Sequence, residues 1–372
     1  MECKFALLAF SCLLLQQCVA YNVEDSTTLE VPKLNKSTSY CNVFQGSWVY
    51  DDAYNPYYNS STCSSLIKEF DCLSNGRPDQ HYLKYKWKPS DCDLPRFDGQ
   101  DFVTRFTGKK IMFVGDSLSL DQWQSLTCML QTALPHSTHK FTVKHGLSIF
   151  TIMEYNISVM MYRTPYFVDV VSEKIGRVLK LDSIKNGNAW KGMDVIIFNS
   201  WHWWVHKGST SQGWDYIQKG KKIYKDMDRL TAYKYGLTTW SKWVNSYAKN
   251  SQVFFQGISP THYRSQEWNT STGNCKGETT PISGSTYPTG LPEPVGVVKE
   301  ILSSMSTKVT LLDITTLSQL RKDGHPSIYG LDGNQGNDCS HWCLPGVPDT
   351  WNELLSALLV SQPKKRLLFN QL

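Results

Sequence analysis

The sequence predicts an α/β fold in which helices cover both faces of a parallel sheet, preceded by a smaller module held together by disulfide bonds. Two observations carry this prediction. From Lys109 onward, short apolar segments alternate with segments of helical periodicity, which is typical of buried parallel strands joined by helices. Residues 41–97 differ, because they combine four cysteines with many aromatic and turn-forming residues. The chain of 372 residues is long enough to bury its own core.

The predicted strands are short apolar runs with few polar interruptions. They cover residues 110–115, 193–198, 252–255 and 309–313, and the alternation over 151–162 predicts one or two more. Residues 264–294 are instead rich in Gly, Ser, Thr and Pro. A loop of this length inside a compact domain is usually either functional or disordered, and if Cys275 ties it down we expect it to wall a substrate groove.

The predicted helices follow from apolar residues spaced three and four apart. Trp123, Leu126 and Leu130 indicate a helix directly after the first strand, and residues 223–248 indicate a long one. A capping box at Thr350-x-x-Glu353 predicts the start of a C-terminal helix. One face of that helix carries four leucines, Leu354, Leu355, Leu358 and Leu359.

Composition and charge exclude several classes of protein. Hydrophobic residues make up 41% and charged residues 19%, which excludes intrinsic disorder, a coiled coil and a multispan membrane protein. The net charge of +5 is mild and the basic residues are spread out, whereas a nucleic-acid binder carries a denser basic stripe. This charge is compatible with a weakly acidic polymer such as a polyuronate.

The first 20 residues predict entry into the secretory pathway. Lys4 precedes an apolar run over 5–15, and Cys18-Val19-Ala20 is a small-x-small cleavage pattern, as in a signal peptide. Eleven apolar residues are too few to span a bilayer, which needs about 20. The alternative is an uncleaved signal anchor. Residues 21–40 are polar and aperiodic, which predicts a flexible stem.

The cysteines agree with an oxidising compartment. Three of the 11 cysteines lie in the leader, which leaves eight and predicts four disulfides, with 105 pairings open. Four N-x-[ST] sequons also suit a secreted surface and predict glycosylation at Asn35, Asn59, Asn156 and Asn269.

Ser117 is the first candidate for chemistry. A buried strand ends at Gly115, which permits a sharp turn, and a helix follows. In open α/β sheets, active sites lie at the carboxyl ends of strands, so the Ser117 hydroxyl is expected there. The helix N-terminus would supply the Ser117 N–H to a developing oxyanion. The alternative is that Ser117 only caps the helix.

Asp338 and His341 form the second candidate. A serine hydroxyl has a high pKa and needs an adjacent base, which histidine provides when a carboxylate orients its ring. The spacing of three residues lets one local turn hold Asp338 against His341, and the flanking Cys339 and Cys343, if bridged, would fix that turn. The chain order Ser, Asp, His is one of the known orders for such triads.

The segment after the strand at 193–198 is the third candidate. Asn199 falls at the end of this strand, where its side-chain amide is a tentative second oxyanion donor. Four residues are tentative contacts to sugar rings, Trp201, His202, Trp203 and Trp204. The alternative for the tryptophans is a place in the core. His202 and His206 have metal-ligand spacing but lack the glutamate of H-E-x-x-H, so no metal is predicted.

At this point the residues resemble a known family, the plant trichome birefringence-like proteins, which include the powdery-mildew-resistance pectin-related protein. The resemblance covers nearly the whole mature chain. Its blocks are Cys41–Trp48, Asp71-Cys72, Trp87–Pro89, Val114–Trp123 with Gly-Asp-Ser, Phe198–Trp204 with Asn-x-x-His-Trp-Trp, and Asp338–Gly346 with Asp-x-x-His.

The resemblance implies an SGNH-hydrolase-like domain over residues 98–372, with the cysteine-rich module 41–97 packed on it. It further implies O-acetylation of cell-wall polysaccharide, pectin favoured and xylan possible, through an acetyl-serine. Ser117 would be the nucleophile, His341 the base and Asp338 its orienter. No cofactor is implied beyond an acetyl donor of unknown identity. The implied disulfides are Cys41–Cys92, Cys63–Cys128, Cys72–Cys343 and Cys275–Cys339.

The short leader differs from the anchored members of the family, so the Golgi lumen, reached through a type II signal anchor, and the cell wall are both expected locations. Two other functions remain open. If water reaches the acyl-enzyme first, the same triad makes an acetylesterase of pectin or another polysaccharide. If there is no turnover, the aromatic residues and the mild charge suit a protein that binds and bridges pectin.

Overall fold

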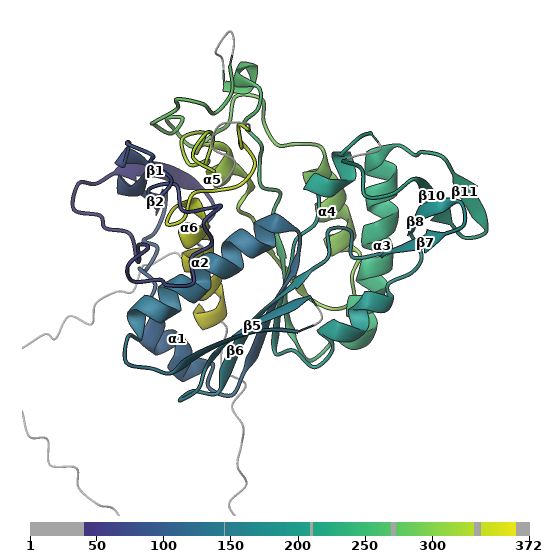
Figure 1. The fold of residues 1–372 in the computed structure, drawn as a ribbon, viewed down its shortest axis with the longest axis horizontal. Helices are drawn as coiled ribbons and strands as arrows, with labels where there is room; N and C mark the ends of the chain where they lie inside the picture. Colours follow the sequence, from purple (N-terminus) through teal and green to yellow (C-terminus); the bar gives the residue numbers. More distant parts are fainter. Residues whose placement is uncertain (1–40, 145, 209–210, 269–272, 331–335, 362–372) are drawn as a thin grey trace, which may run out of the picture. The chain divides into compact units, whose positions relative to one another are not determined.

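The computed structural model describes residues 41–361 except 145, 209–210, 269–272 and 331–335, and it confirms the α/β prediction (Figure 1). Its centre is a seven-stranded sheet of order β13-β12-β9-β3-β6-β5-β4. The strands are β3 (Lys110–Gly115), β4 (His139–Lys144), β5 (Leu147–Ile152), β6 (Ile157–Arg163), β9 (Val195–Phe198), β12 (Gln252–Gln256) and β13 (Val309–Leu312). The predicted leader, the stem and the sequons Asn35 and Asn269 lie outside the described residues.

The sheet is parallel from β13 to β6 and antiparallel at the β5 and β4 edge. The predicted parallel sheet is therefore confirmed over its five strands from β13 to β6, and the sheet ends in an antiparallel edge. The physical reason is connection length, because β4, β5 and β6 follow one another through short turns. A parallel pair needs a crossover of a dozen or more residues, whereas a short turn permits only antiparallel pairing.

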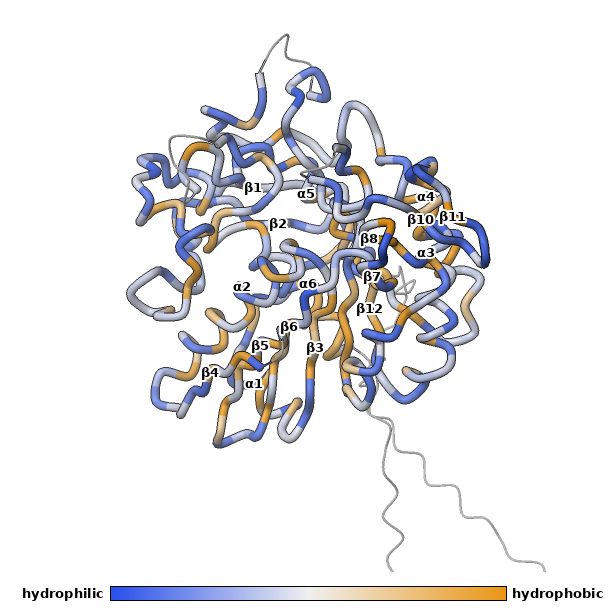
Figure 2. The backbone as a smooth tube through the Cα atoms, turned by 45° about the vertical axis from the view of Figure 1, so that its right-hand side comes forward, coloured by the Kyte–Doolittle hydropathy of each residue, from blue (hydrophilic) through white to orange (hydrophobic). Residues whose placement is uncertain are grey.

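Side chains of the central strand alternate between two cores, one on each face of the sheet. Ile111 and Phe113 join a core with α2 and α6, while Met112 and Val114 join a core with α3 and α4. Figure 2 shows hydrophobic residues concentrated along β3 and β12. The helices are α1 (Gly99–Arg105), α2 (Ser117–Ala133), α3 (Arg229–Tyr247), α4 (Pro294–Ser303), α5 (Thr315–Gln319) and α6 (Val347–Ser361).

A second, four-stranded sheet of order β11-β10-β8-β7 was not predicted from the sequence. Its strands are β7 (Asp169–Glu173), β8 (Gly176–Lys180), β10 (Tyr216–Lys219) and β11 (Lys222–Tyr224). The predicted helix over 223–248 therefore starts too early. Helix α3 begins at Arg229, because the Asp228 side chain accepts a hydrogen bond from Thr231 N and caps it there.

The capping box predicted at Thr350 is also wrong. Helix α6 begins at Val347, and Thr350 lies inside it and is buried. Asp349 instead accepts a hydrogen bond from Gly346 N at 2.9 Å, which satisfies a backbone donor at the helix start. The predicted apolar face is confirmed, because Leu354 and Leu355 are buried in the core against α2.

The cysteine-rich segment packs into the same core as the main sheet. Its regular elements are the antiparallel pair β1 (Gly46–Tyr50) and β2 (Tyr85–Pro89) and the 3-10 helix η1 (His81–Lys84). Tyr58, Phe70 and Trp87 are buried beside residues of α2 and α6. This segment therefore shares a hydrophobic core with the α/β part.

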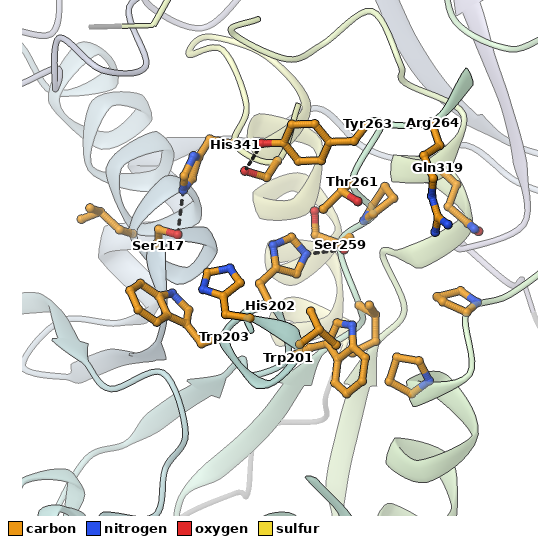
Figure 3. Close-up of a pocket in the computed structure, with 18 of the residues that line it drawn as sticks. Ser117, Trp201, His202, Trp203, Ser259, Thr261, Tyr263, Arg264, Gln319 and His341 are labelled. Atoms are coloured by element: carbon orange, nitrogen blue, oxygen red, sulfur yellow. Dashed lines mark hydrogen bonds between the residues drawn. The ribbon is translucent and has the colours of Figure 1, made fainter. Parts of the chain in front are cut away.

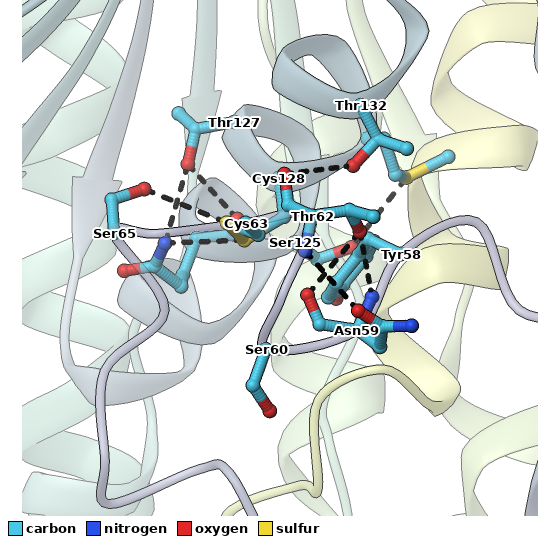
Figure 4. Close-up of a disulfide and its surroundings, with 12 residues drawn as sticks. Tyr58, Asn59, Ser60, Thr62, Cys63, Ser65, Ser125, Thr127, Cys128 and Thr132 are labelled. Carbon is cyan, nitrogen blue, oxygen red and sulfur yellow. Dashed lines mark hydrogen bonds between the residues drawn. A yellow bond between two sulfur atoms is a disulfide. The ribbon is translucent and has the colours of Figure 1, made fainter. Parts of the chain in front are cut away.

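The structure pairs the eight described cysteines as the resemblance implies, Cys41–Cys92, Cys63–Cys128, Cys72–Cys343 and Cys275–Cys339. Cys63–Cys128 joins the cysteine-rich segment to α2, and Asn59 lies beside it (Figure 4). Asn59 and Asn156 are both exposed. Four disulfides suit the oxidising lumen of the secretory pathway. Among residues 41–361 as described, no helix is both long and apolar enough to cross a membrane.

Two buried acids link the cysteine-rich segment to α6. Asp349 accepts hydrogen bonds from the hydroxyls of Tyr58 at 2.7 Å and Ser125 at 2.6 Å, and Glu353 accepts one from Tyr57. Burial raises the pKa of Asp349 to about 6 and that of Glu353 to about 7. Between pH 4 and 7 the folded chain thus holds protons that the unfolded chain has released.

We therefore expect these acids to stabilise the protein more at pH 5 than at pH 8. Stability from a carboxyl whose folded pKa is raised is lost as pH rises through that pKa. Glu353→Gln removes one titration and keeps an acceptor for Tyr57. Urea unfolding of both proteins at pH 5 and pH 8 would give their free energies of unfolding. On going from pH 5 to pH 8, the free energy of unfolding of the wild type should fall by about 2 kcal/mol more than that of the variant. Equal losses in both proteins would contradict this expectation.

Candidate active site

Ser117 lies at the junction between the central strand and α2. Strand β3 ends at Gly115, and Asp116 is the N-cap, its side chain accepting from Leu118 N at 3.0 Å. Capping is thus done by Asp116, which leaves the half-buried Ser117 hydroxyl free to face a cavity. The structure therefore places Ser117 where the sequence predicts a nucleophile.

Gly115 makes this junction possible through its lack of a side chain. A Cβ atom there would lie 2.3 Å from Ser119 Oγ and 2.4 Å from the Asn199 carbonyl oxygen. Both distances are far shorter than van der Waals contact. Glycine thus lets the strand ends of β3 and β9 approach, which brings Asn199 next to the turn that carries Ser117.

Three side chains form a continuous hydrogen-bonded chain at this turn. The Ser117 hydroxyl lies 2.7 Å from His341 Nε2, and His341 Nδ1 lies 2.7 Å from Asp338 Oδ2. With the proton on Nδ1, the ring donates to the carboxylate and Nε2 accepts from Ser117. The order and distances match those of a serine nucleophile, a base and an orienting acid. Figure 3 shows the bond between Ser117 and His341.

Asp338 also builds the turn that holds His341. Its Oδ1 accepts hydrogen bonds from the backbone of Ser340 at 2.9 Å and of His341 at 3.1 Å. The same carboxylate therefore fixes both the backbone and the ring of His341. Disulfides from Cys339 and Cys343 tie the turn to Cys275 and Cys72, and Phe70 packs against the His341 ring at 5.8 Å between centroids.

The electrostatics of the site favour an ion pair between protonated His341 and ionised Asp338. Burial disfavours the imidazolium of His341, but the hydrogen bond with Asp338 and nearby carboxylates outweigh it and raise its pKa to about 9. Burial likewise opposes ionisation of Asp338, but its bonds with His341 hold its pKa well below the usual value. Asp121 also faces His341, yet burial raises its pKa well above the usual range. Asp338 is therefore the carboxylate that stabilises the imidazolium near neutral pH.

A cavity of about 630 Å³ opens beside Ser117 and His341 (Figure 3). Trp201, His202 and Trp203 line it from η3 (His202–Val205) and the residue before this 3-10 helix. His202 Nε2 lies 2.8 Å from the Ser259 carbonyl and donates to it, and burial lowers the pKa of His202. The ring is therefore a neutral part of the wall near pH 7.

The structure contradicts the prediction that Trp204 contacts substrate. Its side chain is fully buried and packs against Tyr166, Trp214 and Tyr233. Its Nε1 donates to Ser200 Oγ at 2.8 Å. Successive residues of the 3-10 helix point to different sides, so Trp203 faces the cavity while Trp204 points into the core.

Asn199 is buried at the end of β9, and its Nδ2 has no hydrogen-bond partner among the described residues. A buried donor of this kind normally has a partner, so its position beside the Ser117 turn suits a group that bonds only during reaction.

The side chain of Asn199 is expected to contribute to turnover as an oxyanion donor. Asn199→Ala should lower kcat about 10²- to 10³-fold with little change in KM, because such a donor acts mainly on the transition state. Steady-state kinetics on an activated acetyl ester would measure this, with Asn186→Ala as a control in η2 (Lys185–Trp190). An unchanged kcat would remove Asn199 from the oxyanion site.

Several lining residues were missed by reasoning from sequence. Glu69 and Phe70 come from the cysteine-rich segment and form part of the wall beside His341. The long segment 264–294 contributes its two ends, as predicted, and includes the 3-10 helix η4 (Ser265–Trp268). The charged residues of the lining are Glu69, Arg163, Arg264, Glu267 and Glu293, besides the histidines. Within the described part of the chain, no three His, Cys, Asp or Glu side chains are arranged to hold a metal ion.

Comparison with family models gives two matches that together cover most of the chain. Residues 94–358 match the model of a GDSL/SGNH-like acyl-esterase family found in Pmr5 and Cas1p. Residues 39–93 match the model of the PMR5 N-terminal domain.

Known proteins of Arabidopsis thaliana are similar over most of their length. Protein trichome birefringence-like 38 is 55% identical over 88% of this chain and 86% of its own length. Protein trichome birefringence is 39% identical over 93% of this chain and 60% of its own length. A carbohydrate esterase family 2 enzyme from Corynascus thermopiles (Myceliophthora fergusii) has 10% identity and a TM-score of 0.29, over 74% of this chain and 70% of that chain. A likeness at that level supports no conclusion.

Proposed function

Because the chain belongs to the trichome birefringence-like family of GDSL/SGNH-like acyl-esterases, we propose that it moves acetyl groups onto hydroxyls of a plant cell-wall polysaccharide. Family membership supports an enzyme that makes or cleaves esters of polysaccharides. The observation that carries the finer proposal is the continuous chain Ser117–His341–Asp338 at the edge of a cavity.

The proposed reaction has two steps. Ser117 Oγ attacks the acetyl carbonyl of a donor while His341 Nε2 takes its proton, and the protonated His341 then gives that proton to the leaving group. In the second step a sugar hydroxyl loses its proton to His341 and attacks the carbonyl of acetyl-Ser117. The bond from that carbonyl to Ser117 Oγ then breaks, and His341 returns the proton to Ser117 Oγ. Asp338 stabilises the imidazolium in both steps. Ser117 N–H and Asn199 Nδ2 are the proposed donors to the oxyanion.

An acetylesterase is the second candidate, because water can replace the sugar in the second step. The cavity is open enough to admit it, since about a fifth of the His341 side chain is exposed. The family model also describes acyl-esterases. The third candidate is a protein that binds pectin without turnover through Trp201 and Trp203.

The charges of the lining bear on the choice of polysaccharide. The net charge of the whole chain favours acidic pectin, but the lining has three glutamates and two arginines. One arginine, Arg264, lies 3.2 Å from Glu267. A polyuronate would therefore meet Glu69 and Glu293 without a matching excess of positive charge. On this ground a neutral xylan chain is the better acceptor for the cavity, and pectin is the comparison.

We further propose that the protein acts in the secretory pathway, in the Golgi lumen or in the cell wall. Asn59 and Asn156 are the exposed sequons of the described chain and are proposed to carry glycans. The identity of the acetyl donor is left to experiment.

The test uses protein secreted from a eukaryotic host beside its Ser117→Ala form. Both are incubated with an activated acetyl donor and either xylan or de-esterified pectin oligosaccharides, and the masses are followed over time. Ser117-dependent gain of acetyl on the oligosaccharide supports the transferase and identifies the acceptor. Ser117-dependent free acetate without that gain supports the esterase. Retention on a pectin column without turnover in either form supports the binding protein.

A further inference from the structure

Two buried histidines outside the triad form a hydrogen-bonded chain that ends at the backbone of His341. His262 and His325 are at most 2% exposed, and His262 Nδ1 lies 2.6 Å from His325 Nε2. The outer nitrogen of each ring contacts a backbone carbonyl oxygen. His262 Nε2 lies 2.9 Å from the carbonyl oxygen of Gln319, and His325 Nδ1 lies 2.6 Å from that of His341. His325 also stacks on Trp342, with ring centroids 4.2 Å apart.

The two histidines help to fix one peptide group of the turn that carries Asp338 and His341. The His341 carbonyl accepts from His325, and the N–H of the same peptide group, that of Trp342, donates to Asp121 Oδ2 at 3.1 Å. Both ends of the peptide group that follows the proposed base are therefore held by buried side chains. The backbone of His262 is anchored in turn, because its N–H donates to the Cys339 carbonyl and its carbonyl accepts from Cys275 N, both at 2.9 Å.

The three contacts of these two rings fix the number of protons that the rings must carry. A carbonyl oxygen can only accept, so His262 Nε2 and His325 Nδ1 must both carry a proton. Two neutral imidazole rings carry two N–H protons in total, and both are then used in the bonds to the two carbonyl oxygens. The inner contact would be left with two facing lone pairs at 2.6 Å. One additional proton completes the row of three hydrogen bonds, whereas a second would place two N–H groups face to face.

We propose that His262 and His325 act as a positioning pair that takes up one shared proton and thereby fixes the peptide group of His341. Neither His262 nor His325 lines the cavity, so they are positioning residues for the proposed reaction, on which this role rests. The pair provides a link between pH and the placement of the base that is separate from the titration of His341 itself.

The surroundings determine the pH range in which the pair takes its proton. Burial is the largest effect and lowers the pKa of both rings, that of His262 to about 4. Carboxylates of Asp323 and Asp338 favour the proton, while Lys322 and His341 oppose it. The other charged or titratable groups packed nearby are Arg77, which donates to the His325 carbonyl, Arg321, which pairs with Asp323, and Tyr287, whose ring packs on His262. The shared proton is therefore taken up on the acid side of neutrality.

The first test is a titration of the histidine rings by NMR in the wild-type protein from pH 8 down to pH 3. The expected result is uptake of one proton by the two rings together, with a strongly deshielded proton between the inner nitrogens and the fold intact. Two separate single-proton titrations, or two rings that stay neutral throughout, would overturn the proposal. This readout does not depend on turnover, so it remains decisive if the proposed function fails.

The second test compares His262→Gln, whose amide donates without an added proton, with His262→Leu, which donates nothing. The exposed His136→Gln is the matched control. We expect the leucine variant to lose about tenfold to a hundredfold in kcat, since a misplaced catalytic group costs that much. The glutamine variant should keep most of its activity at pH 8, and the ratio of wild-type to glutamine kcat should rise as pH falls. A ratio that stays constant with pH, or equal losses in both variants, would show a merely structural role.

Discussion

Asp338→Asn is expected to lower kcat about 10⁴-fold while the protein stays folded. The amide keeps the size of the carboxylate but cannot accept from His341 Nδ1 and stabilise the imidazolium in the same way, so the ring loses its correct tautomer. The bond that it replaces is 2.7 Å long and is the one that favours the charged ring. Steady-state kinetics on an activated acetyl ester would measure the loss, using protein made without N-glycosylation, because the substitution creates an N-x-S sequon with Cys339 and Ser340. Asp91→Asn, an exposed substitution, is the control.

The same substitution should also move the pH dependence of the rate. In the wild type, the pKa of His341 is raised to about 9, so the fraction of neutral base, and with it kcat/KM, should increase as pH rises toward that value. Removing the carboxylate lowers the pKa of His341, so the limb of the profile should shift to lower pH in the slower variant. A large loss of rate with an unmoved limb would show that Asp338 does not set the protonation of His341.

Removal of the Cys72–Cys343 disulfide should have the largest effect on stability. The two cysteines are 271 residues apart, and cross-links that close long loops restrict the unfolded chain most. The pair joins the cysteine-rich segment to the end of the turn that carries Asp338 and His341, where Leu344 N also donates to the Phe70 carbonyl at 2.8 Å. Cys72→Ala with Cys343→Ala is therefore expected to cost about 2 to 5 kcal/mol in the free energy of unfolding.

The double variant should also lose activity at temperatures where it remains folded, because Phe70 and Glu69 line the cavity next to this link. Urea unfolding and kinetics on the folded fraction would separate the two effects. The control is Cys41→Ala with Cys92→Ala, which opens a shorter loop away from the cavity. Similar losses of stability and of rate in both double variants would contradict a special role for the Cys72–Cys343 link.

Local patterns were enough to predict the five parallel strands of the main sheet and the residues of the candidate triad, but they missed β4 at the antiparallel edge. The apolar run that ends at Gly115 and the spacing of Asp338 and His341 each encode their own structure within a few residues. Their meeting was inferred from the chain order Ser, Asp, His, which is one of the known triad orders, and from the resemblance. Errors arose where several local solutions compete, as at α3, where Asp228 rather than the apolar run decides the start of the helix.

The sequence by itself determined the α/β class and showed an even number of cysteines after the leader, which suits an oxidising compartment. Its motifs, together with the resemblance, identified Ser117, Asp338 and His341 as the candidate triad. Only the tertiary structure decided that Trp203 faces the cavity while Trp204 is buried, that Glu69 and Phe70 form part of the wall, and that His262 and His325 hold the backbone of His341. The physical reason is that these contacts join segments far apart in the chain. Periodicity and capping act over a few residues, whereas the packing of distant segments decides which side of a residue meets solvent and which meets the core.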